Sequence, residues 1–148
     1  MAEALLKNKL ENHGIREIQV SSCGLDANPW STAEPRLQLV IGDAYKMLKN
    51  FRSRPISLDI VGEADVILAM EDALVHDILS RFPGADGKTF TVTDYVGVEG
   101  EIVDFPDSHS DFMEWLKSCY ATLDRCLDRL VVRMSRSRAV EDDRGKAS

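Results

Sequence analysis

The sequence predicts an α/β domain of three layers, in which helices cover both faces of a small parallel sheet. The 148 residues are 44% hydrophobic and 29% charged, which is the length and balance of one globular domain with a core. Short apolar runs rich in β-branched residues alternate with amphipathic helical patterns. Such runs are typical of parallel strands that are buried on both faces.

The first predicted element is a helix over residues 2–13. Its apolar positions are Leu5, Leu6 and Leu10, and Gly14 follows as a terminator. The chain starts inside this helix without a capping residue, which leaves backbone donors unsatisfied at its first turn.

Three strands are predicted, at about 16–22, 65–70 and 88–92. The first alternates β-branched with polar residues, and the second reads DVILAM, a continuous apolar run. The third reads KTFTV and follows a turn that contains two glycines.

Helices are predicted between and after these strands. Pro35 suits the first turn of a helix over 35–49, and shorter helices are expected over 57–63 and 71–82. The last helix, over 110–133, has the clearest apolar stripe, with spacings of 4, 3, 4, 3 and 4 residues. Its members are Phe112, Leu116, Cys119, Leu123, Cys126 and Leu130.

The apolar pattern stops after residue 133. We therefore expect a domain over 1–133 and a polar, disordered tail over 134–148.

Composition excludes several function classes. The 18 basic and 25 acidic residues give a net charge of −7, so we expect neither nucleic acid nor a membrane as partner. The N-terminus has no apolar signal region, and three cysteines make no disulfide framework, so the sequence predicts a cytoplasmic protein. The three histidines lack ligand spacing, and we expect no metal or other cofactor.

Several stretches occur in an order and spacing that resemble one family. The chain resembles the low molecular weight protein-tyrosine phosphatases over residues 1 to about 133. The stretches are MAEALL at 1–6, SSCG at 21–24, AEPR at 33–36, FRSR at 51–54, EADVILAME at 63–71, FPGADGKTFTVTDY at 82–95 and GEIVD at 100–104.

The resemblance implies that a catalytic element is missing from these residues. Family members have a strand and a Cys-x5-Arg-Ser-Pro loop directly before Met-Ala-Glu-Ala, and this chain begins at that Met. The missing part amounts to roughly 14 residues at ordinary strand lengths. It would include the central strand of the sheet, the nucleophilic cysteine and the phosphate cradle. We therefore expect the chain as it stands to be inactive and able to self-associate, whereas the full-length form is expected to be a monomer.

Cys119 and Arg125 reproduce the Cys-x5-Arg spacing elsewhere in the chain. On a helix these side chains would point about 120° apart and lie ~9 Å apart along the axis. A phosphate loop must instead curl around one anion, so we interpret Cys119 as a small core residue.

The resemblance also implies a general acid in the loop before the last helix. Asp104 follows an apolar pair, as the family aspartate does, and its spacing to the helix needs no gap. Asp107 follows Pro106 and is the alternative. A loop carboxylic acid can protonate a departing phenolate and then activate water.

Three further residues are expected to line the substrate pocket. Ser22 matches the serine of a family turn that binds the phosphate loop. Trp30 lies where the family places an aromatic wall, and His109 lies near the expected mouth of the pocket. A strand-end hydroxyl, a hydrophobic plug and an exposed loop histidine are the alternative interpretations.

The function implied for the full-length form is hydrolysis of phosphate monoesters on phosphorylated proteins through a cysteinyl-phosphate. Phosphotyrosine is the first expectation and phosphoarginine the second. Arsenate reduction would need further redox cysteines, and residues 64–82 contain none. A truncated, non-catalytic binding protein is the alternative.

Overall fold

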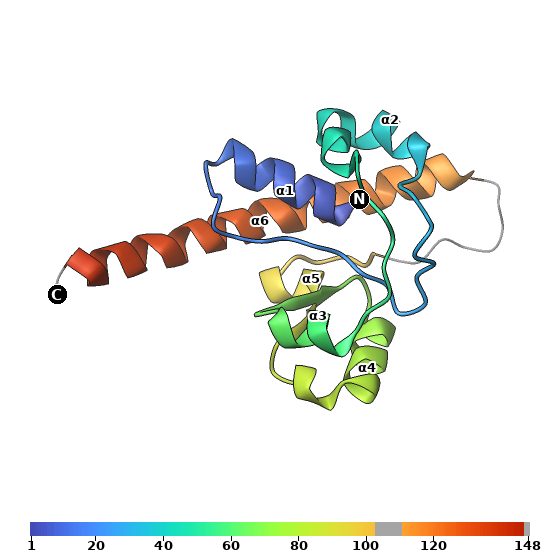
Figure 1. Ribbon diagram of the computed structural model, residues 1–148. Coiled ribbons are helices and arrows are strands. Elements are labelled where there is room, and N and C mark those ends of the chain that lie inside the picture. Colours follow the sequence, from blue (N-terminus) through green and yellow to red (C-terminus); the bar gives the residue numbers. More distant parts are fainter. Residues whose placement is uncertain (103–110, 147–148) are drawn as a thin grey trace.

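The computed structural model describes residues 1–102 and 111–146, with side chains described through Arg136. Figure 1 shows a long C-terminal helix that crosses the body of the molecule. The elements follow the chain as α1 (Ala2–Asn12), η1 (Pro35–Leu37), α2 (Gln38–Ile41), η2 (Gly42–Leu48), α3 (Leu58–Glu63), β1 (Ile67–Ala69), α4 (Asp72–Arg81), η3 (Pro83–Ala85), β2 (Thr89–Thr91), α5 (Val92–Val96) and α6 (Phe112–Lys146).

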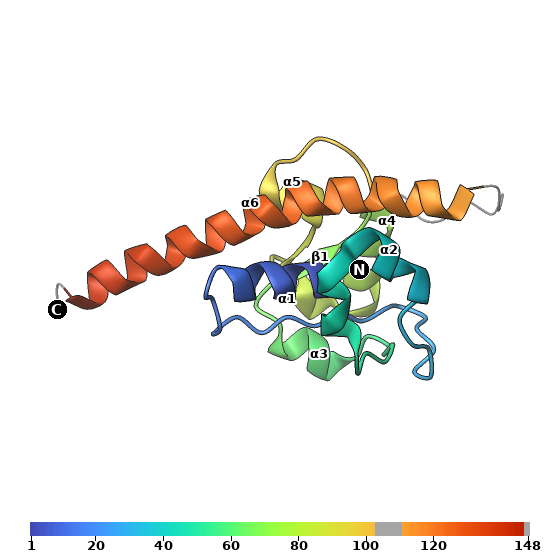
Figure 2. The same cartoon turned by 90° about the horizontal axis from the view of Figure 1, so that it is seen from above.

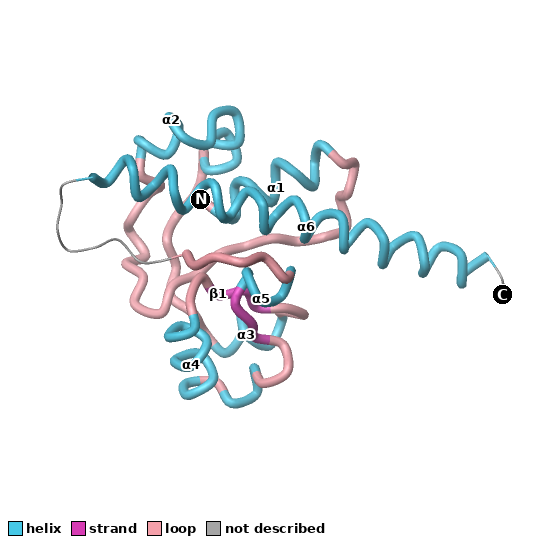
Figure 3. Tube along the Cα trace, turned by 180° about the vertical axis from the view of Figure 1, so that it is seen from behind, coloured by secondary structure: helices cyan, strands magenta, loops and turns pink. Residues whose placement is uncertain are grey.

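The sheet consists of two parallel strands, β1 and β2, joined through α4. Ile67 pairs with Thr89 and Ala69 with Thr91. Helices α3 and α4 lie on one side of the sheet, and α1 and α6 lie on the other (Figures 1 and 3). The predicted α/β class and the parallel pairing of the second and third predicted strands are confirmed.

The first predicted strand, over residues 16–22, is not formed. This segment has no regular secondary structure, and the only pairing nearby within residues 1–102 and 111–146 is an isolated parallel bridge between Gly24 and Pro55. The alternation that suggested a strand reflects burial instead, because Ile15 is buried and Ile18 and Val20 pack against the core. A strand also needs a neighbour that offers backbone partners. The segment does not pair with β1.

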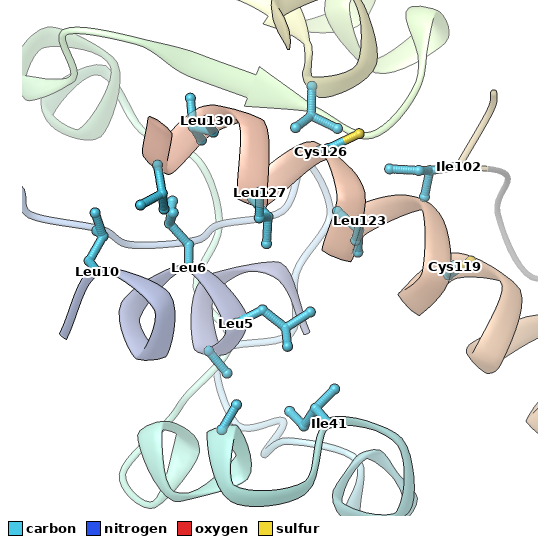
Figure 4. Close-up of a cluster of buried hydrophobic side chains, with 14 of the residues drawn as sticks. Leu5, Leu6, Leu10, Ile41, Ile102, Cys119, Leu123, Cys126, Leu127 and Leu130 are labelled. Carbon is cyan, nitrogen blue, oxygen red and sulfur yellow. The ribbon is translucent and has the colours of Figure 1, made fainter. Parts of the chain in front are cut away.

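Helices α1 and α6 form the larger part of the core. Leu6 and Leu10 of α1 point toward α6, whose buried stripe includes Cys126 and Leu130, and Leu5 lies on the side of α1 that faces Ile41 (Figure 4). Burying apolar area in this way is the main stabilising contribution to such a fold. A smaller cluster joins α3, β1, α4 and η3 on the other side of the sheet, through Val61, Ala69, Ile78 and Ala85.

An ion-pair cluster holds α1 to α6 at the edge of this core. The Lys9 Nζ atom lies 2.8 Å from Asp124 and 2.5 Å from Asp128. Burial alone would lower the pKa of Lys9, but the hydrogen bonds from the two carboxylates outweigh it and raise that pKa.

Two predicted helical regions differ in detail. The helix expected over 35–49 is divided into η1, α2 and η2, because Gly42 has a φ of 52°, a left-handed conformation that interrupts the α-helix. Helix α5 was not expected. Its signals are present in the sequence: the Thr91 side chain accepts from the Asp94 amide at the N-cap, and Gly97 ends the helix with a φ of 65°.

Helix α6 continues well beyond its predicted end at residue 133. It extends to Lys146 and projects past the rest of the molecule (Figures 1 and 2). The prediction that the helix ends at residue 133, with a disordered tail after it, is wrong for residues 134–146. The helical residues after 133 include three Arg, one Ala and no Pro, so the helix can propagate without an apolar face.

None of the helices within the described ranges is long and apolar enough to span a membrane.

Candidate functional site

The candidate site is built around Ser22, where three segments meet. Residues 22–24 run beside residues 54–56, with the Gly24 amide donating to the Arg54 carbonyl at 3.0 Å and the Ile56 amide to the Gly24 carbonyl at 2.9 Å. The first turn of α1 lies against the same segment through the Glu3 side chain.

Glu3 anchors the Ser22 hydroxyl. The Ser22 Oγ atom donates to Glu3 Oε2 at 2.5 Å, and the Lys7 Nζ atom lies 2.5 Å from Glu3 Oε1. Burial would raise the pKa of Glu3, but the hydrogen bonds from Lys7 and Ser22 outweigh it and hold that pKa below its usual value. Glu3 is therefore ionised at neutral pH and fixes the direction of the Ser22 hydroxyl.

Arg54 supplies a cation beside Ser22 and Cys23. Its Nε atom donates to the Ser22 carbonyl at 3.0 Å, and its side chain is exposed. Burial raises the pKa of the Cys23 thiol, and the positive charge of Arg54 partly opposes that rise. A thiol with a raised pKa is a poor nucleophile at neutral pH.

Trp30 lies in the loop that borders this region. The Ser53 amide donates to the Ser31 carbonyl at 2.9 Å, which fixes the loop beside residues 51–55. The Trp30 side chain is 85% exposed, so it does not act as the hydrophobic plug considered from the sequence. An exposed indole next to a polar site is available for contact with a ligand.

The predicted acid residues fall within 103–110. Asp104, Asp107 and His109 therefore lie outside the described residues. The helix that follows is held at its start by Arg36, whose guanidinium lies 4.0 Å from the centre of the Phe112 ring. Arg36 also lowers the pKa of Glu34 to about 2 through hydrogen bonds to that carboxylate.

The two cysteines of α6 are core residues, as predicted. Cys119 is 6% exposed and Cys126 is fully buried. Burial raises the pKa of Cys126 despite the nearby arginines. Neither of these two thiols lies at the surface where Ser22 and Arg54 meet, so neither is placed to attack a substrate there.

The sequence missed two members of this site. Glu3 was treated only as part of a helix, although the family-like MAEALL stretch carries it. Arg54 was noted only within the family-like FRSR stretch at 51–54. Its contact with the Ser22 carbonyl spans 32 residues in sequence, and such a contact leaves no local signal.

The described residues contain no cluster of His, Cys, Asp or Glu side chains able to hold a metal ion.

Comparison with known proteins identifies the family. A family model described as low molecular weight phosphotyrosine protein phosphatase matches residues 1–140. The chain belongs to this family. A protein-arginine-phosphatase from Bacillus subtilis is 33% identical over 105 residues, which cover 70% of this chain and 69% of that protein. The low molecular weight protein-tyrosine-phosphatase PtpA from Staphylococcus epidermidis is 25% identical over 134 residues, which cover 88% of this chain and 84% of that protein.

Solved structures of family members have the same fold. The YwlE arginine phosphatase from Geobacillus stearothermophilus has a TM-score of 0.78 at 28% identity, covering 93% of this chain and 85% of that one. A Bacillus subtilis low molecular weight protein tyrosine phosphatase has a TM-score of 0.75 at 28% identity, and the match covers 93% of this chain and 89% of that one. The arrangement of α1, α6 and the small sheet is therefore that of the family.

Proposed function

We propose that this family member hydrolyses phosphate groups from phosphorylated protein side chains through a cysteinyl-phosphate. The observation that carries the proposal is the family match over residues 1–140, which includes the segments that form the candidate site. The relatives named above are phosphatases of protein tyrosine or protein arginine residues.

The proposed reaction has two steps. A thiolate attacks phosphorus and displaces the side-chain oxygen or nitrogen, which takes a proton from a carboxylic acid. Water, activated by the same carboxylate, then cleaves the sulfur–phosphorus bond and releases inorganic phosphate. We assign the acid to Asp104, with Asp107 as the alternative, and we assign Ser22 to orienting the loop that holds the phosphate.

The nucleophile of this proposal belongs to a Cys-x5-Arg-Ser segment that joins the N-terminal side of α1. The placement of the three cysteines supports this, because two are buried in α6 and the pKa of Cys23 is raised. The 148 residues alone are therefore proposed to lack turnover.

The substrate side chain is either phosphotyrosine or phosphoarginine. Relatives of both kinds cover most of this chain, and their names divide between the two activities. Trp30 offers an exposed aromatic face to a substrate, and such a face stacks on a phenyl ring or on a guanidinium group.

The test compares two polypeptides on three substrates. The 148-residue chain and a version preceded by the in-frame upstream coding sequence are assayed with nitrophenyl phosphate, a phosphotyrosine peptide and a phosphoarginine peptide. Turnover only in the longer version, abolished when its loop cysteine becomes serine, supports the proposal. Turnover by the 148 residues that is lost on Cys119→Ser would overturn it. An upstream sequence without the motif would favour the non-catalytic binding protein.

The acid assignment is tested in the longer version. Removing a general acid lowers the rate by roughly 10²–10⁴-fold. Asp104→Asn should therefore impair a phosphotyrosine peptide far more than nitrophenyl phosphate, whose leaving group needs little protonation. Asp107→Asn is the matched control and should have a small effect. If the two variants exchange behaviour, Asp107 is the acid; if both remain fully active, the assignment is wrong.

A further inference from the structure

Two exposed arginines lie in the segment that borders the candidate site. Residues 51–54 alternate in burial, with Phe51 and Ser53 half-buried and Arg52 and Arg54 exposed. In an extended chain such alternation places residues two apart on the same side, ~7 Å from each other. Arg52 and Arg54 therefore form a pair of cations on one exposed face beside the site.

Arg54 is the nearer of the two to Ser22. Its Nε atom donates to the Ser22 carbonyl at 3.0 Å, and this contact joins two segments of the fold. Arg52 donates from Nη1 to the carbonyl of its own neighbour, Phe51, at 2.8 Å. Because that contact is local, it does not explain why an arginine stands at position 52. A guanidinium has five N–H donors, so Arg52 keeps donors for a carboxylate.

The carboxylates around this face already have cations of their own. Residues 22–34 and the first turn of α1 adjoin the face and carry three carboxylates, each with a single cation as ion-pair partner. The pairs are Glu3 with Lys7 at 2.5 Å, Asp26 with Arg81 at 3.6 Å, and Glu34 with Arg36 at 2.7 Å. Within residues 1–102 and 111–146, no carboxylate forms an ion pair with Arg52 or Arg54. The described surroundings of these two arginines therefore leave them able to attract an anion.

An exposed aromatic side chain lies in the loop next to Arg52. The Ser53 amide donates to the Ser31 carbonyl at 2.9 Å, so the loop that carries Trp30 runs beside the segment that carries Arg52 (Figure 1). The Trp30 side chain is 85% exposed. A small anion would contact the arginines alone, whereas a peptide can contact the arginines and the indole together. This face therefore suits an acidic peptide better than a small anion.

We propose that Arg52 is a specificity residue, which binds an acidic side chain of the substrate protein about two residues from the phosphorylated one. The proposal rests on the proposed function, because it takes the phosphate to lie beside Ser22 and Arg54. Successive residues of an extended peptide are ~3.4 Å apart, so the ~7 Å between the two arginines corresponds to two residues. The carboxylate pairs with Arg52, and the peptide next to it packs on Trp30.

The test is a titration of the 148-residue protein followed by NMR of its backbone amides and of the Trp30 indole, which detects weak binding and does not depend on turnover. The three ligands are phosphotyrosine heptapeptides that carry Asp, Ala or Lys two residues to each side of the phosphotyrosine. Arg52→Gln removes the charge, and Arg52→Lys keeps it. The matched control is Arg136→Gln, which removes the charge of an exposed arginine on α6.

We expect the Asp peptide to bind about threefold more tightly than the Ala peptide at low salt, which is the effect of one exposed ion pair. The Lys peptide should bind more weakly than either. Arg52→Gln should remove the preference for Asp over Ala, whereas Arg52→Lys and Arg136→Gln should keep it. The proposal would be overturned by equal binding of the Asp and Ala peptides, by a preference that survives Arg52→Gln, by an equal loss in Arg136→Gln, or by no binding at all. The dispersion of the amide signals checks that each variant remains folded.

Failure of the proposed function would give a different result. If the longer version turns over none of the phosphorylated substrates but the Asp preference and its loss in Arg52→Gln are observed, the hydrolysis is wrong and the acidic-peptide site remains. If the longer version is active but the Asp preference is absent, the hydrolysis remains and the role given to Arg52 is wrong.

Discussion

Glu3 connects the first turn of α1 to the serine of the candidate site, and Glu3→Gln tests that connection. The carboxylate is 13% exposed and receives Ser22 Oγ and Lys7 Nζ at 2.5 Å each. A hydrogen bond to a charged group contributes about 1.5–3 kcal/mol, and an exposed pair within a helix about 0.3–0.5 kcal/mol. Glutamine keeps a neutral hydrogen bond worth about 1 kcal/mol. The expected loss is therefore about 1.5 kcal/mol.

That loss corresponds to a fall in Tm of about 3–6 °C for a domain of this size. It can be measured by thermal unfolding followed by circular dichroism at about pH 7. The matched control is Glu11→Gln, which makes the same change at an exposed position of the same helix. Glu11→Gln should change Tm by at most a degree or two, because surface substitutions usually shift stability by about 0.5 kcal/mol or less.

The pH dependence of the Tm distinguishes the contribution of the Glu3 charge from that of the packing of its side chain. The folded-state pKa of Glu3 lies below its ordinary value of 4.5, so the carboxylate contributes stability above pH 4.5. This contribution disappears as the pH falls from 4.5 through the lower folded-state pKa. The difference in Tm between the unchanged protein and the Glu3→Gln variant should therefore be smaller at about pH 3 than at about pH 7. An equal difference at both pH values, or an equal loss in Glu11→Gln, would refute the reasoning.

Other predictions concern the sheet, the thiols and the α1–α6 contact. Lys88→Met should lower the free energy of unfolding by about 2 kcal/mol in urea titration, since its Nζ atom binds two carbonyls at the end of α3 at 2.7 and 2.8 Å. Lys49→Met, at an exposed position, is the control, and an equal loss there would contradict the prediction. Cys23 should react with Ellman's reagent in the folded protein, whereas the two α6 thiols should react only after unfolding; three equally fast thiols would contradict the burial described here. Lys9→Met should lower stability by about 1 kcal/mol near neutral pH and by less in about 1 M salt, and an unchanged loss in salt would argue for packing.

The sequence predicted most helices and both strands of the sheet to within a few residues, because their signals are local. The stripe of α6 reports burial directly. The apolar run at β1 does so only in part, because Ala69 is buried, Ile67 and Leu68 are partly buried and Val66 is 40% exposed. The incorrect prediction of a strand at residues 16–22 arose from the same inference, from an apolar pattern to a buried element. Alternating apolar residues report one buried face, but a strand also requires a partner for its backbone, which alternation cannot reveal. The continuation of α6 beyond residue 133 was missed because an apolar stripe was required where helix propensity alone is sufficient.

The candidate site was only partly predictable for a different reason. Ser22 was proposed as a site residue because a short family-like stretch carries it, and in the structure it contacts Glu3 and Arg54. Those two contacts join residues 19 and 32 positions apart, so no window of the sequence contains both ends. Arg54 points its Nε–H at a backbone carbonyl, an interaction that any residue at position 22 could accept. Its side-chain identity therefore leaves no signal at the position that it contacts.

At the candidate site, Glu3 is paired on both sides, because the Ser22 hydroxyl donates to one carboxylate oxygen and the Lys7 ammonium contacts the other. The Ser22 hydroxyl is therefore fixed by interactions that are already complete, and a completed network holds a geometry. Removing the charge of Glu3 should accordingly lower the Tm. A Glu3→Gln variant with an unchanged Tm would show that this network does not hold the first turn of α1 to Ser22.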